Sequence, residues 1–167
     1  MSATDAYRIG VLTLSDKGAQ GQRVDESGPA VQKMLEAIGQ VSRVAISPDD
    51  IKSIVDILTS WSDHERLNLI VTTGGTGLTC RDVTPQATLQ VIDYQIPGMA
   101  EVMRMQSLSK TPHAMLSRAV VGVRRQTMII NLPGSPKAAR ENLAAVLPAL
   151  PHALAKLAGD PDDCGQS

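Results

Sequence analysis

The stretch Leu69–Thr88, LIVTTGGTGLTCRDVTPQAT, decides the fold because it joins a buried strand to a helix through a glycine-rich turn. Its first five residues are apolar or β-branched, which is typical of a strand buried on both faces. At its far end, Thr84 is predicted to cap a helix that has Pro85 in its first position. This order of strand, turn and helix favours an α/β domain.

The turn, Gly74-Gly75-Thr76-Gly77, has three glycines in four positions. Glycine tolerates positive φ and lets a ligand approach the main chain closely. Unpaired N–H groups between a strand and a helix bind anions, so the turn is either an anion site or a sharp strand exit with nothing bound. The spacing excludes a P-loop, since no Gly-Lys-Ser/Thr follows, and it also excludes G-x-G-x-x-G.

Two charged residues, Arg81 and Asp82, follow the glycines directly. An arginine there can pair with a substrate anion. A carboxylate would repel the anion unless it holds a metal, orients a group or takes a proton, so the pair points to chemistry more than to storage. An ordinary solvated ion pair is the alternative.

The composition of the 167 residues fits one domain with one sizeable core, spanning 1–167, with flexible ends at 1–6 and 160–167. Aromatic residues make up 2% and Phe is absent, so the core must consist of Val, Ile, Leu, Ala and Met, as in layered α/β domains. The scarcity of aromatic rings argues against single-stranded nucleic acids as partners. A net charge of −1 provides no basic footprint for duplex DNA.

The two cysteines, Cys80 and Cys164, show no metal-binding spacing, and a disulfide between them is not expected. Cys80 is interpreted as a passive loop thiol, because no base is evident beside it; a nucleophile is the alternative. The chain begins without a signal-peptide pattern, and no apolar run reaches the roughly 20 residues of a membrane span. We therefore expect a cytoplasmic protein without membrane contact.

The remaining patterns alternate strands and helices. Strands are predicted at 7–15, 41–46, 69–73, 119–123 and 127–132, and helices at 27–38, 47–61, 84–92, 99–108, 136–147 and 151–157. Ser47 and Ser135 are predicted helix caps, each followed by proline, and a bend is expected near Pro148 and Pro151. The strands around 124–126 form a hairpin. The fold class is α/β, with three layers: a mostly parallel central sheet, helices on both faces and one antiparallel hairpin.

Four polar or glycine-rich junctions follow strands, at 15–18, 47–50, 74–82 and 133–137. In a sheet that is mainly parallel, such exits gather at one edge and bind ligands there. Glycine and helix-start amides would bind phosphates, and carboxylates could hold a divalent ion. A simple turn remains the alternative for Ser15 and Asp16, and helix-dipole stabilisation is the alternative for Asp49 or Asp50.

These residues carry a resemblance. Residues 73–77 (TGGTG) and 81–85 (RDVTP) resemble the signature of the molybdopterin adenylyltransferase family, the MogA/MoaB type that includes the G domains of plant molybdenum insertases and of gephyrin. Other matching segments are Leu14-Ser15-Asp16, Ser27-Gly28-Pro29, Pro48-Asp49, Met115-Leu116-Ser117-Arg118 and residues 131–136, Asn-Leu-Pro-Gly-Ser-Pro. The likeness extends from about residue 8 to residue 159.

The resemblance implies a nucleotidyltransferase of molybdenum cofactor biosynthesis. In that family, the phosphate of molybdopterin attacks the α-phosphorus of ATP with a divalent cation, typically Mg²⁺, and pyrophosphate leaves. By match, Asp49 and Asp82 correspond to the family's functional acidic residues, and we expect one or both of them to hold Mg²⁺ and position the nucleotide phosphates. The expected molybdopterin- and nucleotide-binding residues are Ser15, Asp16, Gly74, Gly75, Thr76, Gly77, Ser117, Pro133, Gly134 and Ser135.

The resemblance also implies a homotrimer and a hand-off of product to a molybdenum-insertion protein. The Met-rich helix at 99–108 is our candidate for an interface contribution. His64, His113 and His152 are interpreted as structural or exposed. The alternative function is a non-catalytic molybdopterin carrier or an oligomeric scaffold domain, and a third is a MoaB-like protein with another nucleotide substrate.

Overall fold

The computed structural model describes residues 7–161, so residues 1–6 and 162–167 lie outside the description that follows. Cys164 and most of the ends expected to be flexible fall among these residues. Asp160 is described, and its N–H donates to the Ala155 carbonyl. Within the described part, no helix combines the length and apolarity that crossing a bilayer requires.

The central sheet has six strands in the order β2-β1-β3-β6-β5-β4. They are β1 (Tyr7–Leu14), β2 (Gly39–Ser47), β3 (Leu69–Thr73), β4 (Tyr94–Gln95), β5 (Val121–Arg124) and β6 (Thr127–Leu132). The pairs β1/β2, β1/β3 and β3/β6 are parallel, whereas β5 is antiparallel to both β6 and β4. The predicted mostly parallel sheet with one antiparallel hairpin is confirmed.

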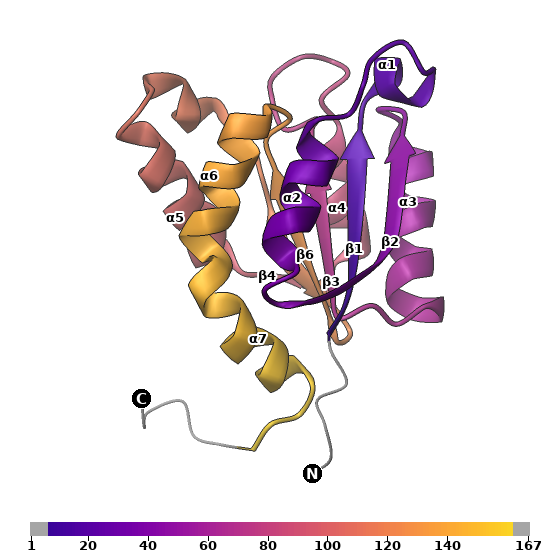
Figure 1. The fold of residues 1–167 in the computed structure, drawn as a ribbon, viewed down its shortest axis with the longest axis vertical. Coiled ribbons are helices and arrows are strands. Elements are labelled where there is room, and N and C mark those ends of the chain that lie inside the picture. The colour runs from indigo at the N-terminus through magenta and orange to yellow at the C-terminus, as the bar shows by residue number, and fades with distance from the viewer. Residues whose placement is uncertain (1–6, 162–167) are drawn as a thin grey trace.

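Helices cover both faces of this sheet. They are α1 (Asp16–Ala19), α2 (Ser27–Leu35), α3 (Ile51–Thr59), α4 (Thr84–Val91), α5 (Pro97–Leu108), α6 (Pro136–Val146) and α7 (Leu150–Leu157). Figure 1 shows α6 continuing into α7 along one side of the sheet, with α2 beside it. A short 3-10 turn, Leu147–Ala149, makes the bend expected near the two prolines.

Two aliphatic clusters lie on the two faces of the sheet, and β3 divides its side chains between them. Leu69 and Val71 pack with α2 and α6, whereas Ile70 packs with α3 and α4. This alternation follows from the two-residue period of a strand. Every residue of β3 and β6 is buried, as expected for strands covered on both faces. Aliphatic side chains and methionine make up nearly all of the buried core, and the second cluster also contains Trp61.

Two predicted helix caps were wrong in position. Asp50, not Ser47, caps α3, because its carboxylate accepts the Ser53 N–H while Ser47 is the buried last residue of β2. Val83 is the N-cap of α4, and Thr84 is already inside the helix with its hydroxyl donating to the Gly74 carbonyl. Ser135 caps α6 as predicted.

The sequence patterns did not predict several short elements. The predicted turn at 15–18 is the four-residue helix α1, capped by Ser15. A π-helical turn, Ser60–His64, extends α3, and a 3-10 helix, Pro112–Leu116, precedes β5. β4 has only two residues, too few for a recognisable alternation. The helix expected over 27–38 ends at Leu35 because β2 begins at Gly39.

Candidate active site

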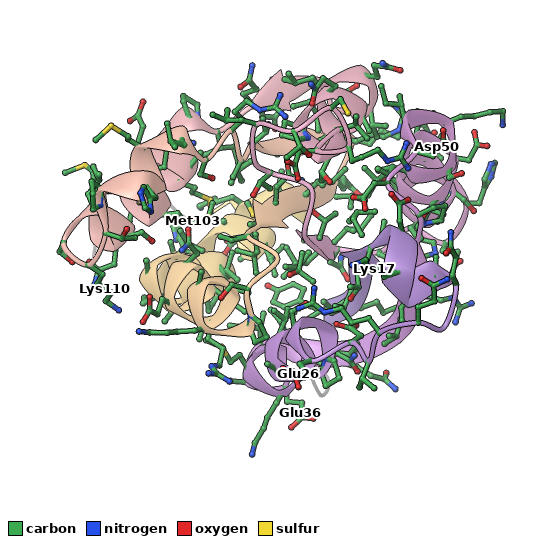
Figure 2. The ribbon with its side chains drawn as sticks, turned by 90° about the horizontal axis from the view of Figure 1, so that it is seen from above. Lys17, Glu26, Glu36, Asp50, Met103 and Lys110 are labelled. Atoms are coloured by element: carbon green, nitrogen blue, oxygen red, sulfur yellow. The ribbon has the colours of Figure 1, made fainter. Side chains whose placement is uncertain are left out.

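A cleft of about 420 Å³ opens at the carboxyl ends of the parallel strands, where the four polar junctions meet. Its wall includes Ser15 after β1, Asp49 after β2, Gly74 and Gly75 after β3, and Gly134 after β6. Figure 2 shows the molecule from above, with Lys17 of α1 and Asp50, the N-cap of α3, among the labelled side chains. Ligands bind at such edges in open α/β sheets because the strand exits leave a crevice there.

The glycine loop requires glycine at its first two positions. Gly74 has φ 104° and Gly75 has φ 66°, both in a region that side chains disfavour. A Cβ atom on Gly74 would lie 2.4 Å from the Leu14 carbonyl oxygen, and one on Gly75 would lie 2.2 Å from the Thr84 hydroxyl. The loop backbone therefore packs so closely against β1 and α4 that a side chain at either position would clash.

The loop also presents unpaired amides. The Gly74 N–H donates to the Leu132 carbonyl at 3.0 Å and so completes the sheet. The N–H groups of Gly75, Thr76 and Gly77 have no acceptor among the described residues. Consecutive free N–H groups in a glycine turn favour an anionic ligand.

A buried polar network supports the loop from below. The Asn131 amide donates to the hydroxyls of Thr72 and Thr88, each at 3.0 Å, and its oxygen accepts the Val120 N–H. Thr84 then bonds the Gly74 carbonyl at 2.9 Å. The Thr88 hydroxyl donates to the Thr84 carbonyl at 2.9 Å and so connects the two parts, and the network holds β3, β6, α4 and the loop in one arrangement.

Asp49 and Asp16 join the exits of β2 and β1. The Asp16 N–H donates to the Asp49 carboxylate at 3.1 Å, and the Asp49 N–H donates to the Asp16 carboxylate at 3.0 Å. Arg81 adds two bonds to Asp16, at 2.9 and 2.7 Å, and thereby brings the glycine loop into the same group. The Arg81 bonds lower the pKa of Asp16 below its usual value.

Burial raises the pKa of the Asp49 carboxyl, and the negative charges of Asp16 and Asp82 add to that rise. The hydrogen bond from Asp16 and the charge of Arg81 act in the opposite direction. Asp49 is thus a half-buried carboxylate in a negative field. A cation between Asp49 and Asp82 would relieve this cost.

Asp82 lines the same cleft from the far end of the glycine loop. One of its carboxylate oxygens accepts the Thr79 N–H at 2.8 Å and the Thr79 hydroxyl at 2.7 Å. Within residues 7–161, no three His, Cys, Asp or Glu side chains gather to hold a metal by themselves. Two carboxylates completed by substrate phosphates are nevertheless the usual protein contribution to a Mg²⁺ site, so this donor set fits Mg²⁺.

The structure separates the predicted site residues into two groups. Those on the cleft wall are Asp49, Asp82, Ser15, Gly74, Gly75, Gly134 and Ser135. The others do not line the cleft. Asp16 bonds Arg81, and the Thr76 and Pro133 carbonyls accept bonds from Arg118 and Thr73. Gly77 packs on Asp82, and Ser117 is partly buried before β5. Cys80, His64, His113 and His152 are exposed, and none of them lines the cleft.

Sequence reasoning missed the wall that precedes α2. Asp25 lines the cleft and accepts bonds from the Thr13 hydroxyl at 2.6 Å and from the Gly28 N–H at 2.9 Å. The signal was an acidic residue three positions before Gly28, where a carboxylate can satisfy a helix-start amide. Arg118 was also missed as a loop contact, since it is distant from the loop in sequence.

Fold and site together define a doubly wound α/β domain with a cleft at the carboxyl ends of its strands, lined by carboxylates and glycines. The family model described as "Probable molybdopterin binding domain" matches residues 10–152, and the chain belongs to this family. The predicted resemblance is therefore confirmed.

Relatives and solved structures agree with this family. The molybdopterin adenylyltransferase of Helicobacter pylori strain J99 is 41% identical, and the match covers 91% of this chain and 88% of the relative. Gephyrin of Dictyostelium discoideum is 43% identical over 94% of this chain, which spans only 23% of gephyrin. The molybdopterin biosynthesis enzyme MoaB of Thermus thermophilus superposes with a TM-score of 0.86 at 52% identity, covering 93% of this chain and 98% of that one.

Proposed function

We propose that this protein is a molybdopterin adenylyltransferase, which transfers AMP from ATP to the molybdopterin phosphate and releases pyrophosphate. The observation that carries the proposal is that Asp49 and Asp82, from two different strand exits, line one cleft together with Gly75, whose N–H has no acceptor among residues 7–161. The Helicobacter relative, which bears this name and matches nearly its full length, supports the same activity.

The chemistry is carried by the two substrates, so the protein has to position them and neutralise charge. An oxygen of the molybdopterin phosphate attacks the α-phosphorus, and the bond from that phosphorus to the pyrophosphate oxygen breaks. The free N–H of Gly75, which lies on the cleft wall, binds an anionic phosphate oxygen. Asp49 and Asp82 would hold Mg²⁺, which when bound supplies charge stabilisation for the phosphates. Fixing both substrates in this way supplies most of the rate increase that the reaction needs.

The assembly and the cellular setting belong to the same proposal. We place a homotrimer contact on α5 and the following 3-10 helix, where Val102, Met105 and Met115 are exposed, at 46%, 69% and 62%. Met103 of the same helix is buried in the core and does not contribute to this surface. A cytoplasmic location and a hand-off to a molybdenum-insertion protein complete the proposal, and the gephyrin likeness supports a link to insertion.

A non-catalytic carrier or scaffold is the second candidate, favoured by the match to a segment of gephyrin. Pyrophosphate release from ATP, with and without molybdopterin, separates the two. We expect molybdopterin-dependent release by the unchanged protein. Binding of the pterin without any release would favour the carrier.

Three isosteric variants locate the centre. Asp82→Asn and Asp49→Asn should each lower kcat by about 100-fold or more, because a lost metal-holding carboxylate costs several kcal/mol of transition-state stabilisation. Asp50→Asn is the control, because Asp50 caps α3 and lies outside the cleft wall. Unchanged turnover in Asp82→Asn would remove Asp82 from the mechanism.

A further inference from the structure

The segment from Gly74 to Asp82 is long for a turn, and most of its bonds lie at its first two residues or within itself. Thr84 holds the carbonyls of Gly74 and Gly75. Thr79 and Asp82 bond each other in both directions. Beyond these, two arginines anchor the segment to the rest of the described chain: Arg81, through the partly exposed Asp16, and Arg118.

Arg118 makes three separate bonds to the segment. Its backbone N–H donates to the Thr76 carbonyl at 3.0 Å, its Nε donates to the Gly77 carbonyl at 2.8 Å, and its Nη2 donates to the Asp82 carbonyl. One side chain therefore ties the middle of the segment, at Gly77, to its end at Asp82. The planar fork of arginine can reach two carbonyls at once, which a lysine ammonium on a flexible stem does not do in the same geometry.

These bonds determine which way the peptide groups of the segment face. In a trans peptide, the C=O and the following N–H point in opposite directions. The N–H groups of Gly77 and Leu78 therefore point away from Arg118, and neither has an acceptor among residues 7–161. The Asp82 backbone is held in the same way, and its side chain reaches the cleft wall.

The charge of Arg118 adds to the effect. Arg118 is partly buried, and no carboxylate lies within 4.0 Å of its guanidinium in the described part of the chain. By contrast, Arg81 and Arg124 are paired with Asp16 and Asp63. Because Arg118 is bonded to carbonyls and not to a carboxylate, no neighbouring negative charge offsets its positive charge. That charge favours an anion near the segment.

We propose that Arg118 is a positioning residue for the reaction: it presets the segment Thr76–Asp82 so that the Asp82 carboxylate faces the substrates. This inference rests on the proposed function for its catalytic part. Its structural part, that the Arg118 fork orders the segment, stands independently of any activity.

The structural part is tested by hydrogen exchange on the ligand-free protein. Arg118→Lys keeps the charge and removes the fork. We expect the amides of residues 76–82 to exchange at least tenfold faster, while those of β1 and β3 stay unchanged. Arg104→Lys is the matched control, because partly buried Arg104 donates one bond to the Ala119 carbonyl and none to the segment. Unchanged exchange at 76–82, or an equal increase throughout the sheet, would overturn the proposal.

The catalytic part is tested by a double-variant cycle with Asp82→Asn. Arg118→Lys should lower kcat for pyrophosphate release at least tenfold in the unchanged protein, but less than threefold in the Asp82→Asn background, because it acts through Asp82. The same tenfold loss in both backgrounds would reject this role. If the unchanged protein releases no pyrophosphate, the proposed function fails, while hydrogen exchange still decides what Arg118 does. Should Arg118→Lys not fold, Arg118→Gln carries both tests with the same expectations.

Discussion

Two glycine-containing junctions flank the cleft, and they are built differently. The junction after β3 runs from Gly74 to Asp82, has two residues at positive φ, and is bonded by α4, β6 and Arg118. The junction after β6 is a short turn in which Ser135 caps α6, its hydroxyl accepting the Ala138 N–H at 3.4 Å. They touch, since the Thr73 hydroxyl donates to the Pro133 carbonyl.

The difference shows that the same pattern of strand, glycine and helix serves two purposes. The helix start after β6 is capped by its own Ser135, as any helix start can be, and the turn receives one bond from Thr73 at the Pro133 carbonyl. The loop after β3 is held in addition by Leu132 and Arg118, which are distant in sequence, and it keeps unpaired amides and two glycines at positive φ. We therefore expect substitutions to cost more at the first junction than at the second.

The largest difference is expected for alanine in place of glycine. Gly74→Ala should lower the free energy of unfolding by about 3 kcal/mol or more, because its Cβ would meet the Leu14 carbonyl and φ is positive. Gly134→Ala should lower the free energy of unfolding by about 1 kcal/mol or less, because the nearest atom to its added Cβ would be the Gly74 Cα at 3.3 Å. Urea denaturation of both variants measures these free energies of unfolding. Equal losses in the two variants would show that the junctions do not differ in their support.

A smaller difference is expected for the two hydroxyls. Thr84→Val should cost about 1–3 kcal/mol, because it leaves the buried Gly74 carbonyl without its donor. Ser135→Ala should cost about 0.5 kcal/mol, because the cap is exposed and its bond is long. The same denaturation experiment ranks them, and a larger loss for Ser135→Ala would contradict the distinction between local and tertiary support.

The smallest expected effect is on the pH dependence of stability, and it concerns Asp49 and Asp50 after β2. One of them is supported locally and the other by a residue distant in sequence. Asp50 caps α3 locally, and the bonds from Ser53 lower its pKa. Asp49 is held by Asp16 from another strand exit, and burial raises its pKa. Asp50 therefore adds stability above the usual aspartate pKa of 3.8 and loses it as pH falls through its lower folded value. Asp49 behaves oppositely, since its ionisation costs stability as pH rises from 3.8 through its higher folded value.

Thermal unfolding between pH 3 and pH 7 without metal checks these signs. Relative to the unchanged protein, Asp49→Asn should gain stability as pH rises, and Asp50→Asn should lose it. The same sign for both variants would show that the two carboxylates do not differ in their support.

Much of the fold was predictable because the strands and helices repeat strong local patterns. The burial of Leu69–Thr73 and of Thr127–Leu132 follows from continuous apolar and β-branched runs. Helix starts were less predictable, since Ser47, Asp50 and Thr84 can all cap a helix and only their surroundings decide which one does. The two-residue strand β4 exists only because β5 pairs with it.

The sequence by itself determined the α/β class, the strand exits that meet, and the family to which the chain belongs, because periodicity and short motifs are local properties. Only the tertiary structure decided that Asp16 bonds both Arg81 and Asp49, and that Asp25 lines the cleft wall. The tertiary structure also decided that Arg118, 36 residues beyond Asp82, donates a hydrogen bond to the Asp82 carbonyl at the end of the glycine loop. The physical reason is that a hydrogen bond depends on distance and direction in space, and the folding of the sheet brings distant parts of the chain to one edge.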